Sequence, residues 1–122
     1  MSKKTEEFLR LMLNFLPSAE DEYRESIEYY GEVLETIIIE RVFMPKIINL
    51  LSEEKNIKLL ESIFKYFEEV SNDNDTHLKN VFSTTVLEVL GNDRSILGTA
   101  QKYMGNKTKQ LQIETDRALG RI

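Results

Sequence analysis

A chain of 122 residues is long enough for one domain with a real core, residues 1–122, and too short for a catalytic domain plus a regulatory one. The absence of cysteine excludes disulfide frameworks, thiolate zinc sites and cysteine nucleophiles. The formal net charge of −5 argues against nucleic acid as a partner and favours a basic one, because phosphate binding depends on clustered lysine and arginine.

The first expected element is a helix over residues 2–16, which places Phe8, Met12 and Phe15 on one face and ends at Pro17. Polar residues interrupt this apolar segment and no small-residue cleavage site follows it, so we do not interpret it as a signal peptide. No other apolar run approaches the roughly 20 residues of a membrane-spanning helix. We therefore expect a cytoplasmic protein with no membrane partner.

The second expected helix follows Ser18, a good N-cap residue, and is strongly acidic. Residues 20–35 contain seven acidic residues against one arginine, whereas residues 102–122 contain five basic residues against two acidic ones. A solvated face is one interpretation of each charged end. A surface that attracts a partner of opposite charge is the other.

The tyrosines of this acidic helix define a candidate binding site. Tyr23 and Tyr30 share a helical stripe with Ile27, which predicts that both are core residues. Tyr29 lies off that stripe, among glutamates on the exposed side of the helix. A tyrosine ring offers area for burial, and carboxylates steer a basic protein toward it. The predicted partner-binding residues are Tyr29, Glu25, Glu28 and Glu32.

Helical spacing continues over residues 32–42, although the β-branched run at 37–39 also fits a strand. A lone strand has no sheet to join in this chain, so we expect a helix. Pro45 is expected to kink or restart it. The apolar excess over residues 33–51 also fits a seam between two copies of the chain, which makes a homodimer the alternative form of association.

A helical hairpin is expected over residues 56–90. Two apolar stripes at helical spacing are separated by a polar break at 71–76, whose residues are typical of turns and caps. Neither helix can bury its stripe alone, so the two are expected to pack together. Two further helices follow, over about 93–104 and 107–119. The stripes are Ile57, Leu60, Ile63, Phe64, Phe67 and Val70, then Leu78, Val81, Phe82, Thr85, Val86 and Val89.

Every long element is therefore expected to be helical, and the predicted fold class is all-α. Successive antiparallel helices with short connections form either a small bundle or a short stack of helical hairpins of the HEAT or armadillo type. The spacing of the helices fits both arrangements.

No group of residues in the sequence has the pattern of a catalytic site for a particular reaction. His77 is the only histidine and is interpreted as a surface residue in a first helical turn. The string at 73–75 lacks the glycine and the glutamate that a calcium loop needs, and adjacent carboxylates such as Glu68 and Glu69 diverge on a helix surface. We expect no catalytic residue, no cofactor and no metal site. An enzyme that uses carboxylates with a recruited metal is the third functional hypothesis.

Residues 59–69 and 80–88, with the ending 108–111 and 119–121, resemble a family of short, uncharacterised bacterial all-helical proteins. The resemblance covers about residues 43–121 and leaves the acidic segment outside it. It implies a helical stack of the HEAT or armadillo type and transfers no catalytic residue. Some similar small acidic bacterial proteins act as immunity partners of secreted toxins, which is an analogy rather than a motif.

The leading functional hypothesis is a non-enzymatic, cytoplasmic bacterial protein-binding module of the immunity or antitoxin type. It would mask a basic surface of a partner protein with Tyr29 and the acidic face around it. The alternative is a self-associating structural or adaptor protein.

Overall fold

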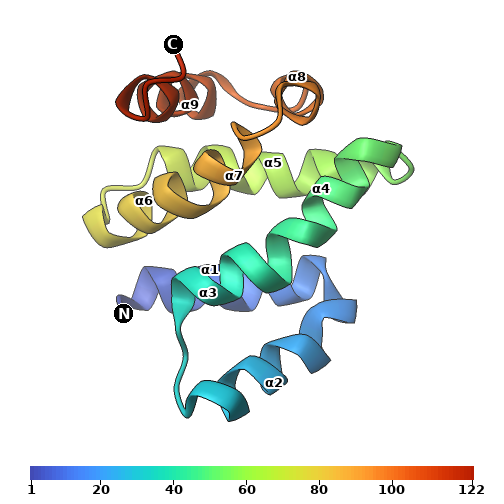
Figure 1. The fold of residues 1–122 in the computed structure, drawn as a ribbon, viewed down its shortest axis with the longest axis vertical. Helices are drawn as coiled ribbons and strands as arrows, with labels where there is room; N and C mark the ends of the chain where they lie inside the picture. The colour runs from blue at the N-terminus through green and yellow to red at the C-terminus, as the bar shows by residue number, and fades with distance from the viewer.

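The computed structural model describes residues 1–122 and contains helices but no strand (Figure 1), which confirms the predicted all-α fold class. A short 3-10 turn, Pro17–Ala19, and two π-helical turns, Ile39–Phe43 and Ser83–Leu87, join helices that follow one another in the chain. The α-helices are α1 (Lys3–Phe15), α2 (Glu20–Tyr30), α3 (Glu35–Ile38), α4 (Met44–Glu53), α5 (Ile57–Ser71), α6 (Thr76–Phe82), α7 (Glu88–Leu90), α8 (Arg94–Gln101) and α9 (Asn106–Ala118).

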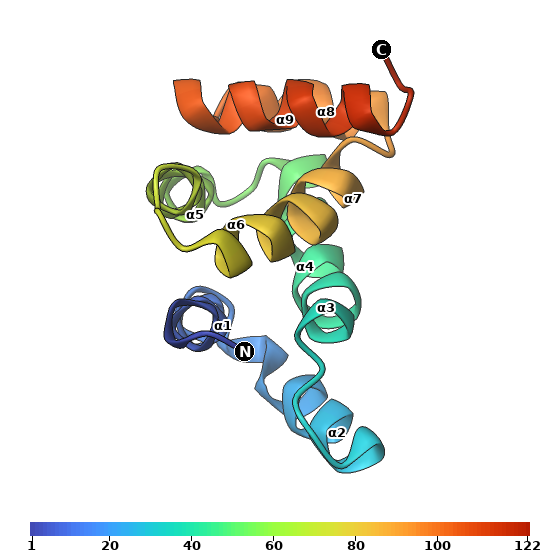
Figure 2. The ribbon, with the colours of Figure 1, turned by 90° about the vertical axis from the view of Figure 1, so that its left-hand side faces the viewer.

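The helices lie in successive layers along the long axis of the molecule (Figures 1 and 2). The acidic α2 forms one end, and α1 and α3 lie next to it. α5 follows beside α6 and α7, and α8 and α9 form the opposite end. α4 runs obliquely from the layer of α3 to contact α8. The acidic and basic segments of the chain are therefore at opposite ends of the fold.

One hydrophobic core runs through these layers, with phenylalanine rings at its centre. The ring of Phe67 in α5 is fully buried, and its centroid lies 5.1 Å from that of Phe64 and 5.2 Å from that of Phe82 in α6. Phe8 of α1 packs on both Phe67 and Phe82. The two stripes of the expected hairpin thus face each other and α1 closes over them. Ile57 is the exception, because the first residue of α5 is 49% exposed.

Residues 37–39 are helical, and the chain continues from α3 to α4 through a π-turn. In that turn the N–H of Met44 donates to the carbonyl of Ile39, five residues earlier. Pro45 is the second residue of α4. A π-turn widens the helix where proline cannot donate to the residue four positions before it. The predicted restart at Pro45 is therefore a local change of hydrogen-bond register within a helical segment.

Most apolar residues of 33–51 belong to the core of a single chain. The π-turn and α4 pack against the π-turn of residues 83–87 and against α8. The apolar residues that are only half-buried, and so remain for a seam between two copies, are Val33, Leu34, Ile37, Ile48 and Leu50. A homodimer through this segment therefore stays a prediction. The buried residues are Ile38, Ile39, Val42, Phe43, Met44, Ile47 and Leu51.

Short-range capping bonds fix where several helices begin. The side chains of Asn56, Asp75 and Asp93 accept hydrogen bonds from backbone N–H groups in the first turns of α5, α6 and α8. The prediction that Ser18 is the N-cap of α2 is wrong. It lies within the 3-10 turn, which runs directly into α2, and Ala19 stands at the N-cap without a side-chain bond.

Candidate functional site

Residues close in the sequence fix where helix α2 begins and ends. It follows the 3-10 turn at Pro17, and the carboxylates of Glu20, Asp21 and Glu22 in its first turn complement the positive end of the helix dipole. It ends at Gly31, whose φ of 75° places it in the left-handed conformation that terminates helices. The acidic face is therefore presented on a complete three-turn helix.

No residue of α2 is buried, which distinguishes it from the other long helices. Tyr23 and Ile27 are half-buried and pack on the core, with the ring of Tyr23 6.2 Å from that of Phe43. This burial raises the pKa of the Tyr23 hydroxyl. The rest of the helix stands at the end of the molecule with no element over it (Figures 1 and 2). One long side of α2 is thus open to a partner.

Two adjacent tyrosines form an exposed aromatic pair near the end of α2. The side chain of Tyr29 is 82% exposed, as predicted, and that of Tyr30 is 37% exposed. Their ring centroids lie 4.8 Å apart in an edge-to-face arrangement. The prediction that Tyr30 is a core residue is wrong, because no element covers the last turn of α2 even though the helical stripe points that way.

A groove of about 470 Å³ runs between α2 and the segment from α3 to α4. Of the four predicted partner-binding residues, Tyr29 and Glu25 line this groove, whereas Glu28 and Glu32 do not. The wall opposite α2 carries two apolar side chains and one cation. The lining residues are Glu22, Glu25, Ser26, Tyr29, Tyr30, Ile37, Arg41 and Val42.

The ion pairs of this region divide its carboxylates into two classes. Glu22 binds Lys46, with 3.0 Å between carboxylate oxygen and Nζ, and Arg24 pairs with the other two acids of the first turn. The predicted residues Glu25, Glu28 and Glu32 take part in no ion pair. These three carboxylates therefore keep their negative charge available to a partner.

Two polar groups near α2 also lack partners within the chain. The Oγ of Ser26 is buried in the wall of the groove and makes no hydrogen bond. Arg41, on the opposite wall, forms no ion pair. Sequence reasoning missed Ile37, Arg41 and Val42 as groove residues, because nothing local to residues 37–42 shows that they face α2.

The single histidine lies on a contact between helices. The Nε2 of His77 in the first turn of α6 lies 2.6 Å from Oε1 of Glu35 in α3, and the other oxygen of Glu35 is buried without a partner. His77 is exposed, as predicted. No group of three or more histidine or carboxylate side chains is arranged to hold a metal ion.

Comparison with known proteins identifies a family but no activity. The family model described as Domain of unknown function (DUF7674) matches residues 9–120, which include the acidic helix α2 as well as the later helices. No curated protein and no solved structure matches the chain. None of the helices is both long and apolar enough to cross a membrane. Because the match covers nearly the whole chain, the protein belongs to the DUF7674 family, a domain whose function is unknown.

Proposed function

We propose that this chain is a non-enzymatic protein-binding module that masks a basic surface of a partner protein with the open side of α2. The observation that carries the proposal is the exposed ring of Tyr29 in a segment with three carboxylates that have no ion-pair partner, Glu25 and Glu28 of α2 and Glu32 just after it. A helix with no buried residue has an open side on which a second protein can pack.

The two kinds of side chain have different tasks in this proposal. The unpaired carboxylates attract lysine and arginine residues over a distance and raise the association rate. The tyrosine pair supplies rigid area that is buried on contact, which slows dissociation. The groove beside Tyr29 and Glu25 accepts one long basic side chain, whose stem would lie on Ile37 and Val42.

The finer part of the proposal concerns the biological setting. We propose a bacterial immunity or antitoxin role in the cytoplasm, in which a short helical stack of the HEAT or armadillo type presents α2 to a basic toxin. Masking a toxin requires no catalytic group and no cofactor. A self-associating adaptor, with a seam over the half-buried apolar residues of 33–51, is the alternative.

The test compares two charge-reversal variants with the same change of net charge. The first carries Glu25→Lys, Glu28→Lys and Glu32→Lys. The matched control reverses three exposed acids outside α2 that form no ion pair. Tyr29→Ala is made separately. The control substitutions are Glu6→Lys, Glu61→Lys and Glu69→Lys.

Affinity purification from the native host identifies candidate partners, and each one is then purified and measured directly by surface plasmon resonance. We expect a basic partner whose association rate falls at least about tenfold with the α2 reversal and changes little with the control. Tyr29→Ala should increase its dissociation rate by about tenfold. Equal effects of the two reversals, or no basic protein that binds directly, would refute the proposal.

A further inference from the structure

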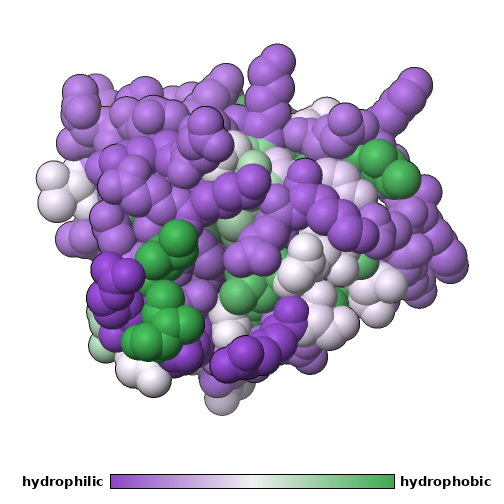
Figure 3. All heavy atoms as spheres, turned by 90° about the horizontal axis from the view of Figure 1, so that it is seen from above, coloured by the Kyte–Doolittle hydropathy of each residue, from purple (hydrophilic) through white to green (hydrophobic).

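A second pocket lies at the opposite end of the molecule, between α8, the turn after α7 and the last turn of α9. Seen from that end, the surface is mostly hydrophilic with small separate hydrophobic spots (Figure 3). The pocket has a volume of about 470 Å³, enough for a small organic molecule, and only two of its nine lining residues are hydrophobic. It lies far from α2 and has no part in the function proposed above (Figure 1).

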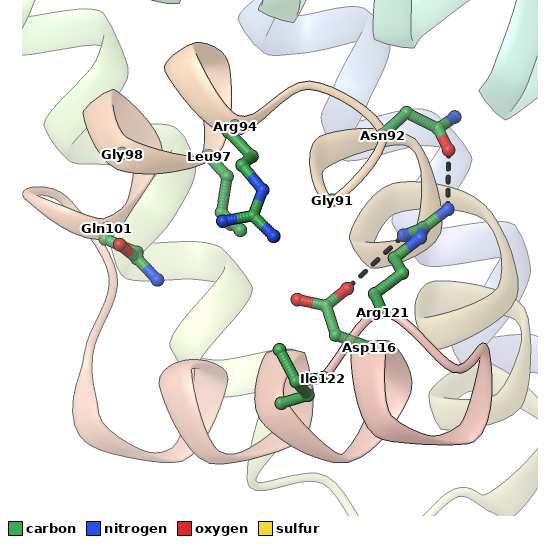
Figure 4. A pocket seen from close by; sticks show the side chains of 9 residues that line it. All are labelled: Gly91, Asn92, Arg94, Leu97, Gly98, Gln101, Asp116, Arg121 and Ile122. Atoms are coloured by element: carbon green, nitrogen blue, oxygen red, sulfur yellow. Dashed lines mark hydrogen bonds and ion pairs between the residues drawn. The ribbon is translucent and has the colours of Figure 1, made fainter.

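The carboxylate of Asp116 lies at the base of this pocket and is only half satisfied. The residue is 6% exposed. Its Oδ1 accepts hydrogen bonds from Nε2 of Gln112, at 3.1 Å, and from Nη1 of Arg121, at 3.3 Å. Its Oδ2 accepts none and points into the pocket (Figure 4). The side chain is thus nearly buried, while its Oδ2 is open to the pocket and can accept a hydrogen bond from a ligand.

The two arginines of the pocket differ in their freedom. Arg121 is held in place, since it donates to the carbonyl of Glu88 at 3.0 Å, to Asn92 and to Asp116. Arg94 makes no hydrogen bond and no ion pair through its side chain, and its guanidinium points toward the centre of the pocket (Figure 4). Arg94 is therefore the cation that is available to an anionic group of a ligand.

The packing at Gly91 shows that the base of the pocket is closely built. A Cβ atom at this position would collide with the carboxylate of Asp116 and with the guanidinium of Arg121. Only glycine lets this ion pair rest directly against the backbone after α7. The free oxygen of Asp116 is thus held in one place rather than carried on a mobile surface side chain.

We propose that this pocket binds a small organic monoanion that also carries a hydrogen-bond donor, and that the acidic amino acids are the class that fits. Among the side chains that line the pocket, two arginines stand against one carboxylate, and a ligand of net charge −1 neutralises this excess of one positive charge. One ligand carboxylate pairs with Arg94, and the ligand ammonium donates to Oδ2 of Asp116. The aliphatic carbons lie against Leu97.

Isothermal titration calorimetry tests this proposal with three probes of nearly equal size. L-glutamate carries both the negative charge and the ammonium, glutarate lacks the ammonium, and L-glutamine lacks the net charge. We expect L-glutamate to bind with a Kd of about 1 mM or below and the other two at least about tenfold more weakly. No binding of L-glutamate at about 10 mM, or equal binding of all three probes, overturns the proposal.

Two substitutions locate the binding at the pocket, and circular dichroism checks that each variant is folded. Arg94→Gln changes an exposed side chain and should weaken L-glutamate binding about tenfold. Asp116→Asn should remove the preference for L-glutamate over glutarate, because the attraction between the ligand ammonium and the Asp116 carboxylate disappears. The control Arg117→Gln removes an exposed charge on α9 outside the pocket and should leave binding unchanged. Unaltered affinity in Arg94→Gln would refute the site even if Asp116→Asn fails to fold.

Discussion

Glu68 is expected to be worth about 2 kcal/mol of stability, although it is a charged residue at the surface of α5 and was interpreted from the sequence as a solvated one. Its Oε1 accepts hydrogen bonds from the backbone N–H of Thr108, at 2.9 Å, and from the hydroxyl of Thr108, at 2.8 Å. Its Oε2 accepts the backbone N–H of Lys107, at 3.0 Å. The carboxylate thus binds the first turn of α9 from a neighbouring helix.

The local sequence of α9 supplies no substitute for this cap. Its N-cap residue is Gly105, which has no side chain to accept a hydrogen bond. A Cβ atom at Gly105 would also collide with the Glu68 side chain, so the glycine is what lets the carboxylate approach. Glu68 therefore satisfies two backbone donors of α9 that are otherwise left to water.

The magnitude follows from these bonds. Loss of a capping side chain costs about 0.5 to 2 kcal/mol, and a hydrogen bond to a charged group contributes about 1.5 to 3 kcal/mol before solvent screening. Because Glu68 is partly exposed, we expect Glu68→Ala to cost about 2 kcal/mol. For a chain of this length that lowers Tm by about 8 °C. Glu68→Gln, which keeps one acceptor oxygen, should lose about half as much.

The adjacent Glu69 is the matched control, because it is exposed and its side chain makes no hydrogen bond or ion pair. Glu69→Ala should change the free energy of unfolding, measured in urea, by no more than about 0.5 kcal/mol. If the two alanine variants are equally stable, water replaces the Glu68 contacts in solution and the reasoning is wrong.

The pH dependence gives a second readout on Glu68. Burial by itself would raise the pKa of this carboxyl, but the hydrogen bonds from Thr108 and Lys107 together lower it below its usual 4.5. A lowered pKa in the folded state means that the contribution to stability is present above pH 4.5 and is lost as the pH falls through the folded-state pKa. The difference in stability between wild type and Glu68→Gln should therefore shrink as the pH falls from neutral toward about 3.

Three further experiments test the core, a contact between helices and a half-buried tyrosine. Phe67→Ala should cost about 3 to 5 kcal/mol in urea unfolding, a large part of the total stability, whereas Ile57→Ala at an exposed position of the same helix should cost clearly less. A double-mutant cycle on His77→Ala and Glu35→Ala should give a coupling of about 0.5 kcal/mol, and a coupling of zero would show that their contact does not form in solution. Burial first and nearby carboxylates second raise the pKa of Tyr66, so stability should be lost as the pH rises above 10, and Tyr66→Phe should lose less between about pH 10 and 12.

The features that the sequence predicted correctly depend on residues close together in the chain. The predicted helix starts near residues 56, 76 and 93 are confirmed, because the side chains of Asn56, Asp75 and Asp93 bind N–H groups only two or three residues away. The stripes of α5 and α6 follow from helical spacing alone, and they are buried except at their margins. The exposure of Tyr29 follows from the same spacing.

The features that the sequence missed depend on residues far apart in the chain. Glu68 and Thr108 are 40 positions apart. The sequence near either residue does not indicate that a side chain of α5 caps the first turn of α9. Tyr30 has the spacing of a core residue but lies where no helix covers α2. Residues 33–51 have the apolar excess of an interface, yet neighbouring elements already bury most of their apolar side chains.

The sequence by itself determined the helices, their polarity and the exposed acidic face, because hydrogen bonds within helices and hydrophobic periodicity act over a few residues. Only the tertiary structure decided which charges remain unpaired. It leaves Glu25 and Arg94 free while it engages Glu22 and Arg121, although each pair is alike in residue type. The physical reason is that an ion pair requires two side chains within about 4 Å, and the packing of the helices sets that distance.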